Sequence, residues 1–126
     1  MLKFDNGMLT YELSLIEKVG ALNASPKASV LNLKSVEYQE NPWTDKVLRG
    51  IRAPGTGLPY LIMLGTMRHG GGKDFCVIYK RRPVLVLEFE GETFSRWVIP
   101  SNEANLKVLE SLKLTNADLS QIRASK

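Results

Sequence analysis

With 126 residues, 44% of them hydrophobic and 24% charged, the chain has the size and composition of one globular domain, which argues against wholesale disorder. Its single cysteine, Cys76, excludes an intramolecular disulfide and a multi-cysteine zinc site, and no apolar run reaches the roughly 18 residues that a membrane-spanning helix needs. A net charge of +4 is a mild excess that by itself indicates neither nucleic acid nor a membrane surface, and because no apolar leader follows Met1 we expect a cytoplasmic protein.

The first third of the chain carries two strand patterns. Apolar and polar residues alternate from 9 to 15, which predicts a half-buried strand, whereas residues 20–27 have the composition of a loop. Between 31 and 38 the apolar residues change from odd to even positions, so we expect a β-bulge or a short turn near Lys34–Ser35. Pro42 then ends this segment, because proline has no N–H to donate to a sheet.

The middle of the chain predicts five more strands. Residues 47–53 form the first, and the proline- and glycine-rich stretch 53–59 is the strongest loop signal in the sequence. The other four predicted strands cover 60–67, 75–80, 84–90 and 94–99, and the connections at 69–72, 81–83 and 91–92 suit hairpins. Residues 61–64 and 84–87 are apolar on both faces, which predicts central strands.

A helix follows Pro100. We expect Ser101 as its N-cap and Glu103 in its first turn, and an apolar stripe then runs from Leu106 to Leu112. Residues 114–126 are expected to form a short docked helix or a frayed tail. The predicted fold class is therefore mainly β, a seven-stranded antiparallel barrel or sandwich capped by one C-terminal α-helix, in a single domain over 1–126 with its core at about 8–113.

The run from Arg49 to Pro59, Arg-Gly-Ile-Arg-Ala-Pro-Gly-Thr-Gly-Leu-Pro, is followed by a strand ending Leu-Gly-Thr at 64–66, then Gly-Gly-Lys-Asp-Phe at 71–75 and Arg-Arg-Pro-Val-Leu-Val-Leu at 81–87. This pattern resembles the pleckstrin-homology-like (PH-like) proteins of bacteria whose function is unassigned. The resemblance implies a non-enzymatic module that presents loops to a protein or lipid partner. Phosphoinositide-binding members resemble one another in a basic cluster of the first hairpin, and this chain lacks the terminal arginine pair of that cluster. A phosphoinositide ligand is therefore not expected.

No residue set indicates catalysis, a cofactor or a metal. His69 is the only histidine and sits beside three glycines, so we expect a solvated loop residue; the glycine run lacks the spacing of a phosphate-binding loop. Cys76 lies among strand apolars and is expected to be an unreactive core residue. Glu88 and Glu90 share a strand face that we expect to meet solvent rather than to form an acid–base pair.

Basic residues are the remaining candidates for a binding surface. They are expected on neighbouring hairpins, where they would form one patch, with Trp43 or Tyr60 available for stacking. The candidate partner-binding residues are Arg49, Arg52, Arg68, Lys73, Lys80, Arg81, Arg82 and Trp43. Three interpretations stay open: charges that keep strand edges soluble, contact with a protein or membrane surface, and single-stranded nucleic acid. The leading hypothesis is a cytoplasmic module that binds a protein or self-associates, with a nucleic-acid-binding barrel as the alternative. A third hypothesis, an enzyme or small-ligand carrier with a pocket in the barrel, has no residue pair in the sequence to support it.

Overall fold

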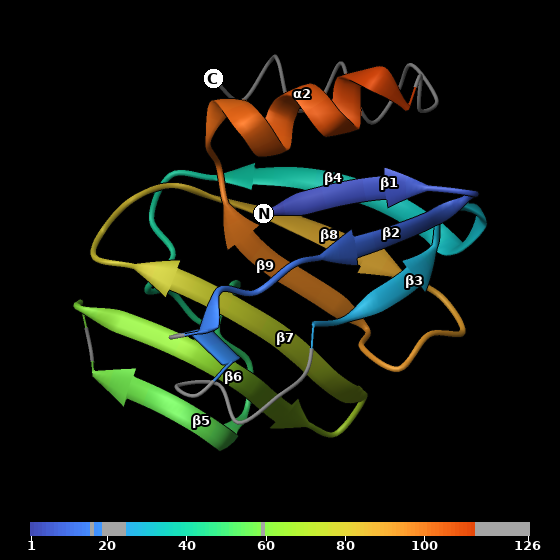
Figure 1. The fold of residues 1–126 in the computed structure, drawn as a ribbon. Helices are drawn as coiled ribbons and strands as arrows, with labels where there is room; N and C mark the ends of the chain where they lie inside the picture. The colour runs from blue at the N-terminus through green and yellow to red at the C-terminus, as the bar shows by residue number, and fades with distance from the viewer. Residues whose placement is uncertain (16, 19–24, 59, 113–126) are drawn as a thin grey trace.

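The computed structural model describes residues 1–15, 17–18, 25–58 and 60–112. Within these residues the chain forms two β-sheets, a 3-10 turn (Val30–Asn32) and the helix α2 (Glu103–Ser111) (Figure 1). The smaller sheet has the order β1-β2-β3 and consists of β1 (Leu2–Asp5), β2 (Met8–Tyr11) and β3 (Lys27–Ser29). The larger sheet has the order β4-β8-β9-β7-β6-β5 and consists of β4 (Leu33–Gln39), β5 (Ile51–Leu58), β6 (Ile62–His69), β7 (Gly72–Tyr79), β8 (Val84–Phe89) and β9 (Arg96–Pro100).

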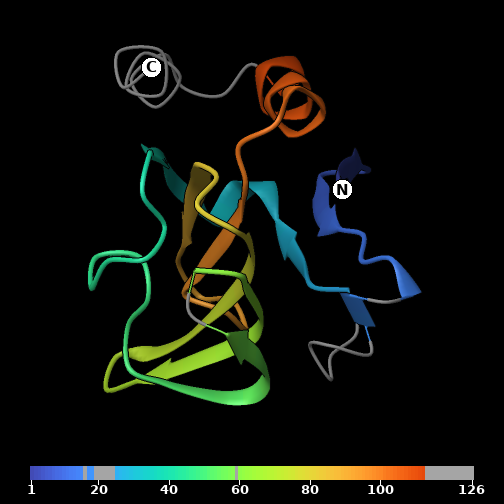
Figure 2. The same ribbon diagram turned by 90° about the vertical axis from the view of Figure 1, so that its left-hand side faces the viewer.

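The six-stranded sheet is covered on both faces, so its central strands are apolar on both sides. On one face, Phe75 and Val77 of β7 belong to a core shared with the three-stranded sheet and α2. On the other face, Cys76 and Ile78 pack in a second core with Val47, which lies in the irregular segment of residues 40–50. Figure 2 shows these layers, with the larger sheet between the smaller sheet and the 40–50 segment. Period-two alternation along one strand thus supplies two cores at once.

Helix α2 closes the first core. Its N-cap is Asn102, one residue later than expected, and the side chain of Asn102 accepts a hydrogen bond from the backbone N–H of Asn105. Leu109 is fully buried, and the rest of the predicted stripe packs around the same core. The buried Asn105 accepts from the N–H of Leu2 (2.9 Å) and donates to the carbonyl of Pro100 (2.9 Å), which fixes the helix to β1 and β9.

The mainly β class with one C-terminal helix is confirmed, as is the irregularity near Lys34–Ser35, where the β4–β8 register shifts between Leu33 and Ser35. Of the predicted seven-stranded antiparallel barrel or sandwich, the barrel, the strand count and the purely antiparallel order are wrong. Over the residues described, the strands form sheets of three and six that do not close into a barrel, and β9 inserts between β7 and β8, parallel to β7. The 81–83 connection therefore does not close a hairpin, because its two strands do not pair with each other.

The predicted loop at 53–59 is also wrong, since most of it lies in β5. Two features of this strand accommodate its turn-type residues. β5 is an edge strand, where a missing proline N–H costs least, and its register against β6 shifts between Arg52 and Gly55, on either side of Pro54.

Other predictions failed at the N-terminal end. β1 and β3 were not expected, and the strand predicted at 9–15 ends at Tyr11. The predictions for 114–126 lie outside the described residues. Among the helices that the structure describes, none is both long and apolar enough to cross a bilayer.

Candidate functional site

A buried carboxylate lies at the start of β7. The parallel register of β7 and β9 places Asp74 beside Arg96, and the exposed fractions of these residues are 0% and 8%. One carboxylate oxygen of Asp74 accepts from Nε (3.1 Å) and Nη2 (2.9 Å) of Arg96. Arg96 also donates to the carbonyls of Lys46 and Val47, so the ion pair holds the 40–50 segment against the sheet.

Two further side chains complete this group, which we call the Asp74 cluster (Asp74, Arg96, Arg49 and His69). Arg49 donates from Nε (2.9 Å) and Nη2 (2.7 Å), one bond to each oxygen of the carboxylate. His69 Nε2 lies 3.1 Å from the second oxygen, while His69 Nδ1 accepts from the N–H of Gly71, so Nε2 carries the proton. The solvated loop histidine predicted from the sequence is therefore wrong, because the His69 side chain is 13% exposed and bonded to a buried acid.

The Asp74 cluster has a structural role. Burial raises the pKa of the Asp74 carboxyl, but the hydrogen bonds from Arg49 and Arg96 and the charge of Arg96 outweigh it and hold that pKa below its usual range. Both oxygens are occupied by fixed donors, so this carboxylate is not available as a general base or a metal ligand. Across the residues that the structure describes, no group of three His, Cys, Asp or Glu side chains is placed to hold a metal ion.

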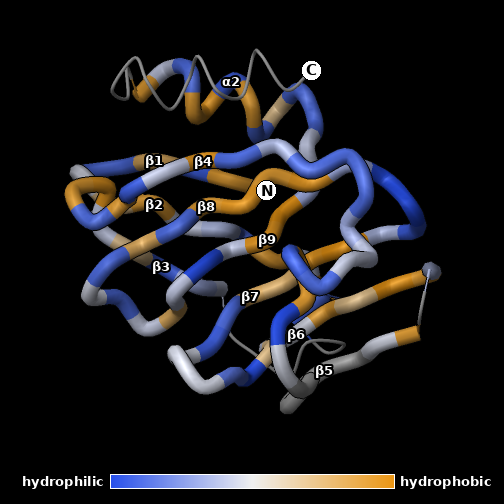
Figure 3. The backbone as a smooth tube through the Cα atoms, turned by 180° about the vertical axis from the view of Figure 1, so that it is seen from behind, coloured by the Kyte–Doolittle hydropathy of each residue, from blue (hydrophilic) through white to orange (hydrophobic). Residues whose placement is uncertain are grey.

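The opposite end of β7 carries an exposed aromatic group, the aromatic tip (Trp43, Leu58, Tyr60, Leu61 and Arg81). The guanidinium of Arg81 lies over the ring of Tyr60 at 4.7 Å, and the rings of Trp43 and Tyr60 are 5.8 Å apart. Trp43 is half-buried and donates from Nε1 to the carbonyl of Lys80 (2.6 Å). The apolar ends of β5 and β6 stand at one corner of the molecule (Figure 3), where Leu58, Tyr60 and Leu61 are 53%, 53% and 59% exposed.

The aromatic tip is held in an unusual backbone conformation. Tyr60 and Lys80 both have a positive φ, 65° and 51°, a backbone conformation that residues other than glycine rarely adopt. Their two turns are joined by a hydrogen bond from the N–H of Lys80 to the carbonyl of Leu61 (2.8 Å). Strained residues of this kind persist where the surrounding contacts fix them, and they cluster at functional sites.

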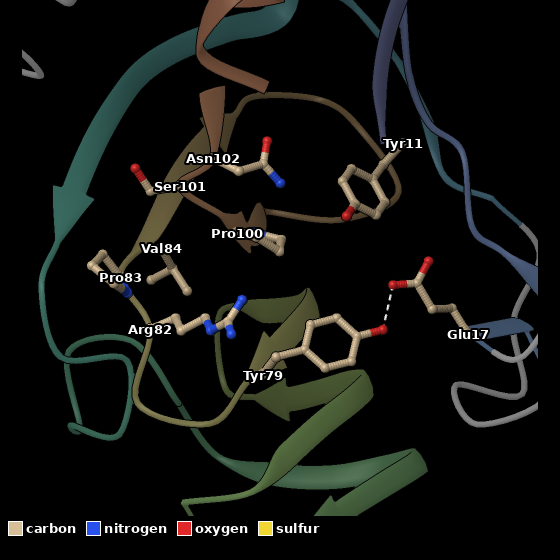
Figure 4. A pocket seen from close by; sticks show the side chains of 9 residues that line it. All are labelled: Tyr11, Glu17, Tyr79, Arg82, Pro83, Val84, Pro100, Ser101 and Asn102. Atoms are coloured by element: carbon tan, nitrogen blue, oxygen red, sulfur yellow. Dashed lines mark hydrogen bonds between the residues drawn. The ribbon is translucent and has the colours of Figure 1, made fainter. Parts of the chain in front are cut away.

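A third feature is a cavity of about 360 Å³ between the two sheets and the start of α2, which we call the polar pocket. Figure 4 shows its lining: Tyr11, Glu17, Tyr79, Arg82, Pro83, Val84, Pro100, Ser101 and Asn102. The hydroxyl of Tyr79 donates to Glu17 Oε2 at 2.5 Å. Burial, followed by this contact with Glu17, raises the pKa of the Tyr79 phenol, which therefore stays protonated.

The structure divides the predicted basic residues between two sites instead of one patch. Arg49 belongs to the Asp74 cluster. Near the same end of β7, Arg68 of β6 lies opposite Lys73 in the antiparallel register, and Lys73 Nζ is 5.1 Å from the centre of the Phe94 ring. Lys80, Arg81 and Arg82 follow the other end of β7, about 23 Å away at about 3.3 Å per residue. Arg52 lies on β5 opposite Met67.

Other sequence expectations are confirmed. Cys76 is fully buried, and burial raises the pKa of its thiol. Glu88 and Glu90 are exposed, as expected.

Sequence reasoning missed Asp74, Arg96 and Glu17. The signal for Glu17 is present, because Ser14 and Glu17 have the spacing of a capping box and form one: each side chain bonds the other's backbone N–H, at 2.9 and 3.2 Å. No sequence signal joins Asp74 to Arg96.

A scan against protein-family models, a search of curated proteins and a search of solved structures each found no match to this chain. The function of this domain is therefore inferred from the geometry of its own side chains.

Proposed function

We propose that this domain is a non-enzymatic interaction module and that the aromatic tip is its binding surface for a protein partner. The observation that carries the proposal is the exposure of three adjacent large side chains, Leu58, Tyr60 and Leu61, beside Trp43 and Arg81. Tryptophan, tyrosine and arginine are the residues that most often dominate the binding energy of protein interfaces. Kinship with the PH-like family remains a prediction.

The rigidity of the aromatic tip supports the same proposal. The hydrogen bonds from Trp43 Nε1 to Lys80 and from Lys80 to Leu61 fix the turns that present the exposed side chains. A surface already ordered before binding loses less conformational entropy when a partner arrives. An exposed apolar group held in this way is better suited to binding than to solubility.

Charge indicates the chemistry of the partner. Arg81 covers one face of Tyr60, and Lys80 and Arg82 flank it in the chain. A partner segment that places an apolar side chain against the tip and a carboxylate against Arg81 would complement both features. We therefore propose a protein segment in which an apolar residue lies next to Asp or Glu.

The test places a photo-crosslinking amino acid at position 60 and, in a second protein, at position 31, where Leu31 is 90% exposed and lies outside the tip. If the aromatic tip is a binding surface, we expect a discrete crosslinked partner from position 60 but not from position 31. We also expect the crosslink from position 60 to disappear in the Arg81→Glu variant. In a third protein the crosslinker stands at a neighbouring position of the aromatic tip and Tyr60 is replaced by glycine, which removes the ring while allowing the positive φ. A loss of the crosslinked partner in this protein would then be due to the missing ring.

Self-association is measured in parallel by sedimentation velocity. A concentration-dependent dimer that Tyr60→Gly abolishes would assign a second copy of this chain as the occupant. A strictly monomeric protein with no crosslink that depends on the tip would refute the proposal.

Single-stranded nucleic acid is the second candidate, because Trp43 and Tyr60 lie beside Arg81 in an arrangement that a base could extend by stacking. It requires an affinity that falls as salt rises. Fluorescence titration with a single-stranded oligonucleotide at two salt concentrations tests it, and an affinity that does not change with salt removes this candidate.

A further inference from the structure

The polar pocket contains none of the five aromatic tip residues, although Arg82 of its lining follows Arg81 in the chain, and it is built from four parts of the chain. Tyr11 comes from β2, Tyr79 from the end of β7, and Ser101 and Asn102 from the residues that begin α2. Glu17 comes from a short helical turn after β2. Its volume of about 360 Å³ is at the lower end of the range of cavities that bind small molecules.

The two charged groups of the pocket are of opposite sign and lie on opposite sides. Figure 4 shows the guanidinium of Arg82 on one side, the carboxylate of Glu17 on the other, and the ring of Tyr79 between them. Among the described residues neither Arg82 nor Glu17 forms an ion pair. A positive and a negative group thus face one cavity without neutralising each other.

Glu17 is fixed in place. Its Oε1 accepts from the N–H of Ser14, and its Oε2 accepts from the hydroxyl of Tyr79. An ionised carboxylate has about four acceptor positions, so two remain for a ligand. With the ring of Tyr79 beside it, this side of the pocket suits an ammonium group.

The Arg82 side presents donors. Asn102 uses its side-chain oxygen to cap α2, so its amide nitrogen stays available and faces the cavity (Figure 4). Ser101 lines the same cavity, but its hydroxyl points away from the centre of the pocket in Figure 4, so the donors here are Arg82 and the amide group of Asn102. A planar guanidinium with neighbouring neutral donors suits a carboxylate.

We propose that the polar pocket binds a small zwitterion, an α-amino acid or a dipeptide, with its carboxylate at Arg82 and its ammonium at Glu17. The largely buried ring of Tyr11 and the half-buried ring of Tyr79 form apolar walls against which the rest of the ligand packs. This site is separate from the aromatic tip and does not depend on the function proposed for it.

The experiment titrates the ¹⁵N-labelled protein with each standard amino acid and with L-alanyl-L-alanine at up to millimolar concentration, following amide resonances by NMR. We expect at least one of these probes to shift resonances of the residues that line the pocket. N-acetyl-alanyl-alanine and alanyl-alanine amide each keep one charge of the dipeptide. If the dipeptide binds, each should bind about tenfold more weakly or worse.

Two variants remove one protein charge each. Arg82→Gln and Glu17→Gln should each weaken binding by about tenfold or more, and glutamine at 17 keeps the capping box with Ser14, which preserves the fold. Lys107→Gln, at an exposed cation of α2 outside both the pocket lining and the aromatic tip, is the control and should leave the affinity unchanged.

The proposal is overturned if no probe in the panel shifts the pocket resonances. It is also overturned if binding survives both charge variants, or if Lys107→Gln weakens binding as much as Arg82→Gln. N-acetyl-alanyl-alanine binding as tightly as the dipeptide would show a simple anion site and would equally refute the zwitterion. Loss of the native spectrum in Arg82→Gln would leave Glu17→Gln and the charge-deleted dipeptides to decide.

Discussion

Replacing Asp74 with asparagine removes one charge from the Asp74 cluster with almost no change in shape. The carboxylate accepts five bonds, from two guanidinium nitrogens each of Arg49 and Arg96 and from one ring nitrogen of His69. An asparagine amide presents one oxygen and one NH₂ group, so donors on one side would face another donor. Arg96, only 8% exposed, would keep its charge without a counter-ion.

The expected cost follows from that burial. Removing one partner of a buried ion pair destabilises a protein by about 3–5 kcal/mol, because an uncompensated charge is left inside. Against a typical stability of about 5–15 kcal/mol, this is a large fraction. An unfolding entropy of roughly 2.1 cal/mol/K per residue gives about 0.26 kcal/mol/K for 126 residues, so Tm should fall by about 11–19 °C.

Urea unfolding followed by tryptophan fluorescence measures the free energy, since Trp97 lies in the core and Trp43 on the segment that Asp74 helps to hold. Asp5→Asn on β1 is the control, because Asp5 is exposed and the same change there should stay within about 0.5 kcal/mol. Adding Arg49→Gln to the wild type and to Asp74→Asn should give a coupling free energy of about 1–3 kcal/mol.

A loss below about 1 kcal/mol in Asp74→Asn, or the same loss in Asp5→Asn, would refute this reasoning. Either result would mean that solvent or a rearranged Arg96 neutralises the cluster at little cost.

Three further outcomes are expected in the same region and its surroundings. Gly50 has φ +81°, and a Cβ there would lie 1.8 Å from the carbonyl oxygen of Arg68, so Gly50→Ala should lower the free energy of unfolding in urea by more than about 2 kcal/mol. At Gly70 a Cβ would meet open space, so Gly70→Ala should change the free energy of unfolding by no more than about 0.5 kcal/mol. Equal losses in the two variants would contradict the geometry. Because the folded-state pKa of Asp74 is lowered, the stability that its carboxylate contributes is complete above the unfolded-state pKa of about 3.9 and is lost as the pH falls through the lower folded-state pKa. The free energy of unfolding should therefore fall more steeply between about pH 5 and 3 in the wild type than in Asp74→Asn. Parallel pH profiles of the two proteins would argue against this role of Asp74. Cys76 is fully buried with a raised thiol pKa, so a thiol reagent should modify it only as fast as the protein opens, and labelling at the rate of a free thiol would show that the second core is accessible.

The local pattern of apolar and polar residues was enough to predict those strands and helices whose buried faces can be identified within the segment itself. The doubly apolar stretch 84–87 predicted a central strand, and β8 lies between β4 and β9. The change of face before Val36 required an extra residue, and the register shifts there. The apolar stripe after Pro100 predicted the capping helix, whose Leu109 is fully buried. In each case the information lies within a few residues, because side-chain periodicity reports burial directly.

Tertiary structure alone decided which strands are neighbours. A stretch with Pro54 and Gly55 has the composition of a loop, and only its place at the sheet edge makes the missing N–H harmless in a strand. The insertion of β9 between β7 and β8 brings Asp74 and Arg96 together from 22 positions apart. Lys73 and Lys80, by contrast, are apart because one lies near the start of β7 and the other follows its end. Residues far apart in a chain become partners through strand order and register, and these depend on the combined packing of both faces of the sheet, a property that no single segment of the sequence contains.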